Sequence, residues 1–193
     1  MLDSFKDYVN GQAKVTEEQF AIVMSCLSPV KAGKGTVLYK QGEQCPYVAF
    51  VLKGCLRSYI TDENNKTHIL EFAPENWWIG DVLSLNRQVP SLFYVDAIED
   101  SELLVAKMDF FQKMPLVFPE FHQLYIYHMH DGLRSIQKRV RHLLGSNAQE
   151  RYFDFLATYP ELGVRLPQHM IASYLGISPE SLSRIRNKFA NRQ

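Results

Sequence analysis

Cysteine is scarce in this sequence of 193 residues, and so are long apolar runs. Cys26, Cys45 and Cys55 are odd in number, and no two of them have a C-x-x-C spacing. This pattern argues against a disulfide framework and a zinc site, and it favours a reducing compartment. No segment approaches 18 apolar residues, and the first residues have no apolar run of signal-peptide length. We therefore expect a cytoplasmic protein with no membrane partner.

Catalytic motifs are missing as well. The sequence has no G-x-S-x-G, H-E-x-x-H or P-loop motif. A metal-dependent β-barrel enzyme of the cupin type would need two or three histidines and an acid on its strands, but His68 is the only histidine in residues 31–107. Among His122, His128 and His130 no two are four residues apart, so a metal or haem site on a helix is also disfavoured. We expect neither an enzyme nor a bound metal, and the cupin-type metalloenzyme is the less favoured alternative.

Net charge of one sign is absent, because 21 basic residues balance 21 acidic ones. The balance hides an asymmetry along the chain. Residues 1–133 carry 11 Lys and Arg against 17 Asp and Glu, a net of −6, whereas residues 134–193 carry 10 against 4, a net of +6. A basic C-terminal quarter on an acidic body indicates a nucleic-acid-binding end, although a solvated basic face would give the same count.

Two kinds of hydrophobic spacing divide the first 118 residues. Residues 3–28 have helical spacing, and Pro29 ends that segment. Short β runs separated by Gly and Asx turns follow at 36–41, 47–52, 55–61, 67–73, 77–79, 92–98 and 101–107. Strands at such intervals indicate an antiparallel sandwich or barrel. Asp109 then has the pattern of a cap that opens a short helix stopping near Pro115.

The longest helical pattern covers residues 119–144. Its apolar residues fall at alternating spacings of three and four, and we assign them to a dimer seam: Ile126, Met129, Leu133, Ile136, Val140 and Leu143. Such a seam is what two helices use to pair as a coiled coil. Packing on its own domain is the alternative, because the run is under three heptads. We favour a homodimer, since a two-fold protein can place two recognition helices one DNA turn, roughly 34 Å, apart.

Two short helices with a tight turn are predicted for residues 166–189. A hinge at Gly145 and a helix at 148–158 precede them. Gly176 can adopt the positive φ of a sharp helix stop, and Ser178 is a good N-cap for the second helix. That helix presents Ser, Glu and Arg near its N-terminus, which is typical of a helix-turn-helix that enters the major groove. An ordinary helical hairpin is the alternative.

The order of β-barrel, pairing helix, hinge and helix-turn-helix resembles the bacterial cyclic-AMP receptor/fumarate–nitrate regulator (CRP/FNR) family of transcription factors. The resemblance covers essentially the whole chain. It is carried by ISPESLSRIR and by GTVLYKQGE, FVLKGCLRSY and WWIGD, which contain Gly35, Gly42, Gly54 and Gly80.

The resemblance implies an α+β fold with three parts. These are N-terminal helices with an antiparallel, cyclic-nucleotide-binding-like β-roll (residues 1–118), a dimerisation helix with its hinge (119–145) and a helix-turn-helix domain (146–193) with a short or absent wing. It also implies that the β-roll senses a small molecule. The implied partners are double-stranded DNA, a second copy of the chain and RNA polymerase.

At the DNA site, the resemblance implies that Glu180 and Arg184 read bases. Their spacing puts both on one helix face, where Arg can bond guanine and Glu can accept from cytosine. Pro179 stands where relatives often have Arg, so base preference differs. Ser181, Lys188 and His169 are candidate phosphate contacts, and Ser183 lies on the same exposed face.

The candidate effector pocket departs from the pattern of cyclic-nucleotide binders. In these binders a Gly-Glu pair opens a short helix, and an Arg-Ser pair about eleven residues later holds the cyclic phosphate. Here the pair is Gly80 and Asp81, Ser91 has no Arg beside it, and Arg87 comes several residues early. A buried cyclic phosphate would lack a charge-assisted partner, so we disfavour a cyclic nucleotide and assign no certain cofactor. A cyclic-nucleotide-binding module that contacts protein is the alternative, against which the basic C-terminal quarter argues.

Overall fold

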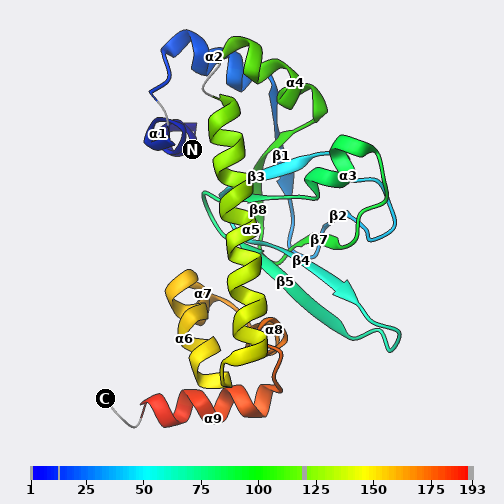
Figure 1. Cartoon of the computed structure of the whole chain (residues 1–193), viewed down its shortest axis with the longest axis vertical. Coiled ribbons are helices and arrows are strands. Elements are labelled where there is room, and N and C mark those ends of the chain that lie inside the picture. The colour runs from blue at the N-terminus through cyan, green and yellow to red at the C-terminus, as the bar shows by residue number, and fades with distance from the viewer. Residues whose placement is uncertain (1, 13, 119–120, 191–193) are drawn as a thin grey trace. The chain divides into compact units, whose positions relative to one another are not determined.

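The computed structural model describes residues 2–12, 14–118 and 121–190. Its elements follow one another as shown in Figure 1: α1 (Leu2–Gln12), α2 (Glu17–Ser25), β1 (Leu27–Ala32), β2 (Val37–Tyr39), β3 (Val48–Lys53), β4 (Leu56–Thr61), β5 (Thr67–Ala73), β6 (Trp78–Ile79), α3 (Val82–Arg87), β7 (Tyr94–Ala97), β8 (Ser101–Ala106), α4 (Met108–Val117), α5 (Phe121–Gly145), α6 (Ala148–Thr158), α7 (Leu162–Arg165), α8 (Gln168–Leu175) and α9 (Pro179–Ala190). The chain divides into two compact units, Met1–Ile60 with Leu70–His128 and Thr61–Ile69 with Met129–Gln193.

Two four-stranded sheets form the predicted β-roll. One has the strand order β1-β8-β3-β6 and the other β2-β7-β4-β5. Strand β8 pairs antiparallel with both β1 and β3, and β7 pairs antiparallel with both β2 and β4. The α+β fold class is confirmed. Each of the seven predicted β runs overlaps one observed strand, β2 to β8; β3 extends one residue beyond its predicted run, to Lys53, and β5 has the predicted bounds.

Strand β1 was not predicted, and the helical assignment of residues 26–28 was wrong. Helix α2 ends at Ser25, and Leu27 already pairs with Ala106 of β8. Pro29 lies inside this strand rather than ending a helix. It is tolerated because β1 is at the edge of its sheet, where a missing N–H need not break a ladder.

The prediction for the helix after the β-roll was wrong at its start and right to within two residues at its end. The N-cap of α4 is Lys107, which makes no side-chain cap bond, and Asp109 lies within the first turn. Pro115 lies inside the helix, which continues to Val117. A proline in the last turn removes only one of the helix's hydrogen bonds, and the amide N of Phe118 still donates to the carbonyl O of Met114 at 2.9 Å.

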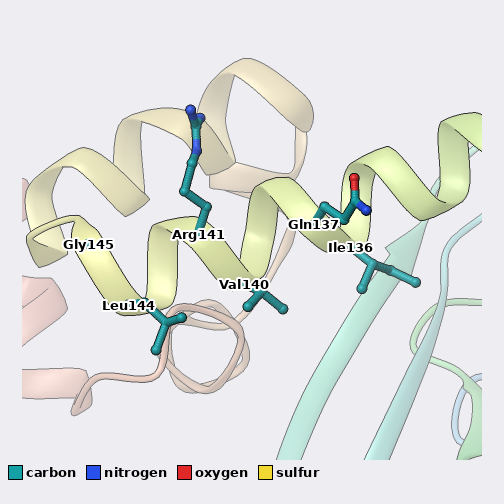
Figure 2. Close-up of a pocket in the computed structure, with 6 residues that line it drawn as sticks. All are labelled: Ile136, Gln137, Val140, Arg141, Leu144 and Gly145. Atoms are coloured by element: carbon teal, nitrogen blue, oxygen red, sulfur yellow. The ribbon is translucent and has the colours of Figure 1, made fainter.

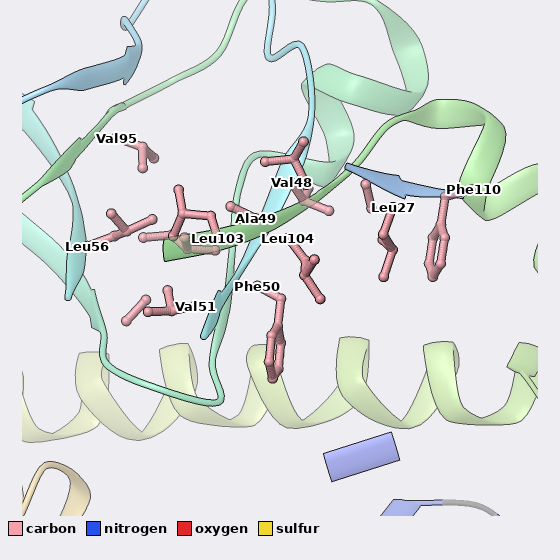
Figure 3. Close-up of a cluster of buried hydrophobic side chains, with 14 of the residues drawn as sticks. Leu27, Val48, Ala49, Phe50, Val51, Leu56, Val95, Leu103, Leu104 and Phe110 are labelled. Carbon is pink, nitrogen blue, oxygen red and sulfur yellow. The ribbon is translucent and has the colours of Figure 1, made fainter. Parts of the chain in front are cut away.

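The core of the β-roll lies between its sheets. Figure 3 shows side chains of Val51, Leu56, Val95 and Leu103 gathered there, and each is almost fully buried. The same buried cluster extends through aromatic side chains to α1, where the ring centroids of Phe5 and of Phe50 on β3 are 4.9 Å apart. Burial of apolar area on this scale is the main term that stabilises the unit.

In the second unit, the predicted break after the long helix is confirmed. Asn147 caps α6 by accepting from the amide N atoms of Gln149 and Glu150, and the Glu150 carboxylate accepts from the Asn147 amide in return. Helix α6 has the predicted bounds, whereas the single turn α7 was not predicted. The three-part domain division stays a prediction. The short or absent wing concerns residues after Ala190, which lie outside the described part of the chain.

Candidate DNA interface, dimer seam and effector pocket

Helices α8 and α9 form the predicted helix-turn-helix. The residues that hold the two helices together are buried, namely Ile171, Ala172, Leu175 and Leu182. Between the helices Gly176 has φ +65°, a left-handed conformation that glycine adopts without a Cβ penalty. The turn is then closed by Ser178, whose Oγ accepts from the amide N of Ser181 at 3.2 Å.

The exposed face of α9 presents an acid and a base together. Arg184 is exposed, and its Nη2 donates to Oγ of Ser181 at 3.1 Å, so the guanidinium is oriented along the helix. Glu180 is exposed one turn earlier. Its pKa is lowered by a hydrogen bond from Ser178, then by its own backbone and by the charge of Arg184. The carboxylate is therefore ionised at neutral pH and can accept hydrogen bonds from DNA.

The other predicted DNA contacts are distributed over the same two helices. Pro179 and Lys188 are exposed on α9, and Ser183 is half-buried there. His169 is exposed near the start of α8. The structure thus places Pro179, Glu180, Ser181, Arg184 and Lys188 on one helix, with His169 on its neighbour. The assignment of these residues to DNA stays a prediction.

Several basic residues in 134–193 form ion pairs or hydrogen bonds with other groups of the protein. Lys138 forms an ion pair with Asp154, and Arg165 pairs with Glu161 at 3.6 Å. Arg151 donates through Nη1 to the carbonyl O of Ser146 at 2.6 Å and through Nε to that of Leu175 at 3.0 Å. These basic groups are neutralised or bound to carbonyls, so they are weak candidates for phosphate contacts. The partners Asp154 of Lys138 and Leu175 of Arg151 lie too far along the chain for sequence spacing to reveal them, whereas Glu161 is only four residues from Arg165.

The predicted dimer seam is an exposed apolar stripe on α5. All six of its residues are exposed large apolar side chains, and Leu144, which we did not assign, is exposed to 85%. Figure 2 shows Ile136, Val140 and Leu144 on one side of the helix, with Gln137 and Arg141 on another. A stripe of this kind is typical of an interface that a partner covers.

In the candidate effector pocket, the side chain of Asp81 hydrogen-bonds to neighbouring residues of the protein. Asp81 is 9% exposed and caps α3, with Oδ1 accepting from the amide N of Ser84 at 2.9 Å. Its Oδ2 accepts from Oγ of Ser91 at 3.1 Å and from the amide N of Leu92 at 3.3 Å. Its amide N donates to the hydroxyl O of Tyr39 at 2.9 Å. The pair of Asp81 and Ser91 predicted from sequence is therefore brought together.

The other two residues of that prediction lie differently. A Cβ at Gly80 would approach Cγ1 of Val48 to 2.6 Å, so this glycine allows two strands to pack closely. Arg87 is exposed in the last turn of α3, away from the buried carboxylate of Asp81. Burial raises the pKa of the neighbouring Tyr39 and Cys45 side chains, which are therefore neutral at pH 7. The pocket thus has one buried anion and no buried cation among the residues described here.

Two further classes of site are not found in the described ranges. No group of three His, Cys, Asp or Glu side chains there is arranged to hold a metal ion. No helix in the same ranges is both long enough and apolar enough to cross a membrane.

Comparison with known proteins agrees with this architecture. Residues 29–115 match the cyclic nucleotide-binding domain. The chain is 23% identical over 167 residues to the Anaerobic regulatory protein of Aggregatibacter actinomycetemcomitans, with 81% of this chain and 64% of that protein covered. It is also 23% identical over 167 residues to the Fumarate and nitrate reduction regulatory protein of Yersinia pestis, covering 81% and 66%. The chain is therefore similar to regulators of the CRP/FNR family.

A solved structure of a CRP/FNR-like fold superposes on most of the chain. FixK2 of Bradyrhizobium japonicum has a TM-score of 0.73 and 20% identity, covering 86% of this chain and 85% of that one. The CRP/FNR family consists of transcription regulators rather than enzymes, and its members bind DNA and act as dimers. The present chain spans about two thirds of the length of the curated relatives it matches, 64% for the first and 66% for the second.

Proposed function

We propose that the protein is a homodimeric, sequence-specific DNA-binding transcription regulator that acts in the cytoplasm. The observation that carries this proposal is the exposed face of α9, where Glu180 and Arg184 lie one turn apart after a capped tight turn. An Arg can donate to O6 and N7 of guanine, and a carboxylate can accept from N4 of cytosine. One helix therefore carries partners for both bases of a G·C pair.

The exposed stripe on α5 supports a homodimer. Ile136 and Val140 are 63% and 49% exposed although both are large and apolar. Pairing with the same stripe of a second copy would remove both from water, at a gain of about 25 cal/mol per Å² of apolar area. A two-fold dimer would bind a palindromic operator, because its two recognition helices are related by the same symmetry.

We further propose that the effector of the β-roll is not a cyclic nucleotide. The buried carboxylate of Asp81 already accepts from Ser84, Ser91 and Leu92. A cyclic phosphate placed there would meet this anion rather than a cation, and burying two like charges together is costly. By family resemblance, RNA polymerase is the proposed protein partner.

Selection of duplexes from a random-sequence pool tests the DNA-binding function. Purified protein should enrich a palindrome whose half-site centres lie about 10 bp apart or a multiple of this spacing. A pool that stays unenriched at low salt would contradict the proposal. The effector is tested separately by thermal unfolding with cyclic AMP and cyclic GMP, where a rise in Tm would contradict its second part.

A further inference from the structure

A side chain of the helix-turn-helix hydrogen-bonds to the backbone at one edge of strand β5. Oγ of Ser173 on α8 donates to the carbonyl O of Thr67 at 2.8 Å and accepts from the amide N of Ile69 at 3.1 Å. Alternate residues of a strand turn their N–H and C=O groups to the same edge, and β5 is the last strand of its sheet. A single hydroxyl therefore takes the place of part of a neighbouring strand.

Arg139 of α5 completes this contact. Its Nη2 donates to the carbonyl O of Ile69 at 2.7 Å and to that of Tyr174 at 3.0 Å. Its guanidinium carbon lies 4.1 Å from the ring centroid of Tyr174. The Tyr174 carbonyl is in the last turn of α8, where carbonyls lack partners within the helix and the helix dipole favours a cation. Arg139, which lies on α5, thus contacts both α8 and the hairpin between β4 and β5 (Thr61–Ile69).

All of these groups belong to the compact unit of Thr61–Ile69 and Met129–Gln193. Helix α5 carries the dimer seam, and α8 packs against the recognition helix α9. A restraint between α5 and α8 therefore sets where α9 lies relative to the seam. In a dimer, the same restraint acts twice and sets the distance between the two recognition helices.

We propose that Ser173 and Arg139 are positioning residues, which fix α8 and the reading face of α9 relative to α5 and to the hairpin Thr61–Ile69. This inference rests on the proposed function, because a fixed spacing matters only for a dimer that reads two half-sites. Strand β5 continues past Ile69 into the β-roll. The hairpin is therefore covalently continuous with the β-roll and hydrogen-bonded to α8.

Hydrogen exchange tests the docking without DNA. Ser173→Ala removes both hydroxyl bonds while keeping a good helix former, so the Ile69 amide should exchange at least tenfold faster. Ser173→Thr keeps the hydroxyl and should restore slow exchange. Ser135→Ala removes an exposed serine from α5 and is the matched control. Exchange of the Ile69 amide at the wild-type rate in Ser173→Ala would overturn the docking.

DNA binding tests the positioning role. The probes are the palindrome selected from the random pool, versions with half-sites moved 1 or 2 bp closer or farther apart, and a single half-site. Ser173→Ala should bind the selected palindrome about tenfold more weakly, the factor that corresponds to about 1.4 kcal/mol. Its affinity for the single half-site should match the wild type, and its preference among spacings should flatten.

The outcomes separate the two proposals. A wild-type spacing profile in both Ser173→Ala and Arg139→Leu would overturn the positioning role while leaving DNA binding intact. Equal weakening on the palindrome and on the half-site would also overturn it, since that is the effect of a damaged reading surface. A wild-type protein that enriches no duplex would instead contradict the proposed function, and the exchange of Ile69 would still report the docking.

Discussion

The three cysteine residues lie in different surroundings. Cys45 and Cys55 are buried, whereas Cys26 is half-buried at the end of α2. Burial raises the pKa of the Cys45 thiol, and its Sγ donates to the carbonyl O of Tyr47 at 3.1 Å. Because the thiolate is the reactive form, a raised pKa means that little of Cys45 reacts at pH 8.

A thiol-reactive chromogenic disulfide at pH 8 should therefore label one cysteine of the folded protein quickly. The other two should react only after unfolding in guanidinium. Cys26→Ser should remove the fast phase, and Cys45→Ser should leave it unchanged. Two fast thiols in the wild type would mean that the β-roll opens near Cys45 or Cys55 under native conditions.

Arg184 is the residue on which base recognition should depend most. Arg184→Ala should cost about 1–3 kcal/mol on the selected palindrome and relax the preference for guanine at one position of each half-site. Arg186→Ala removes the same charge about 200° away around α9 and should leave base preference unchanged. Competition binding with single-base variants of the palindrome measures both. Equal base preference in wild type and Arg184→Ala would place the reading function on another residue.

The exposed stripe of α5 gives a prediction at the scale of one element. Ile136→Glu places a charge in the centre of the stripe, where two copies would bring like charges together and bury them without partners. The variant should sediment as a monomer at concentrations where the wild type is a dimer. Gln137→Glu adds the same charge on another side of the helix (Figure 2) and should stay dimeric. A dimeric Ile136→Glu would place the interface elsewhere.

Elements with local signals were predictable from the sequence, and those that depend on distant partners were not. Residues 67–73 and 148–158 were predicted with the observed bounds, because turn residues flank the strand and Asn147 with Glu150 caps the helix. Strand β1 has only its two end residues buried, so it gives no alternation to detect. Its pairing with β8, more than 60 residues later, decides its conformation.

The candidate site divides in the same way. The shared face of Glu180 and Arg184 follows from helical spacing, because both lie on one helix with local cap and turn signals, whereas their base-reading role was implied by the family resemblance. The roles of Ser173 and Arg139 do not, because their partners are backbone groups 104 and 70 residues away. Asp81 was predictable in part. Its place before α3 was predicted, but its hydrogen bond with Ser91 depends on how the loop folds back.

At the scale of the whole molecule, the charge asymmetry overstates the basic surface that DNA would meet. The net of +6 over residues 134–193 includes Lys138, which is paired with Asp154, and Arg151, which is bound to two carbonyls. Lys188 is exposed on α9 and is a better candidate for a phosphate contact. The number of phosphate contacts should therefore be smaller than the basic count implies.

Salt dependence measures that number. The slope of log K against log [salt] is about −0.9 for each phosphate that the protein neutralises on duplex DNA. Lys188→Ala should make the slope of a dimer shallower by about 2, one contact per protomer, with similar losses on all sequences. Lys138→Ala removes the same charge from α5 and should leave the slope unchanged, because this lysine already has an anionic partner in Asp154. Equal changes in slope for the two variants would mean that the ion pair opens and that Lys138 also contacts the DNA backbone.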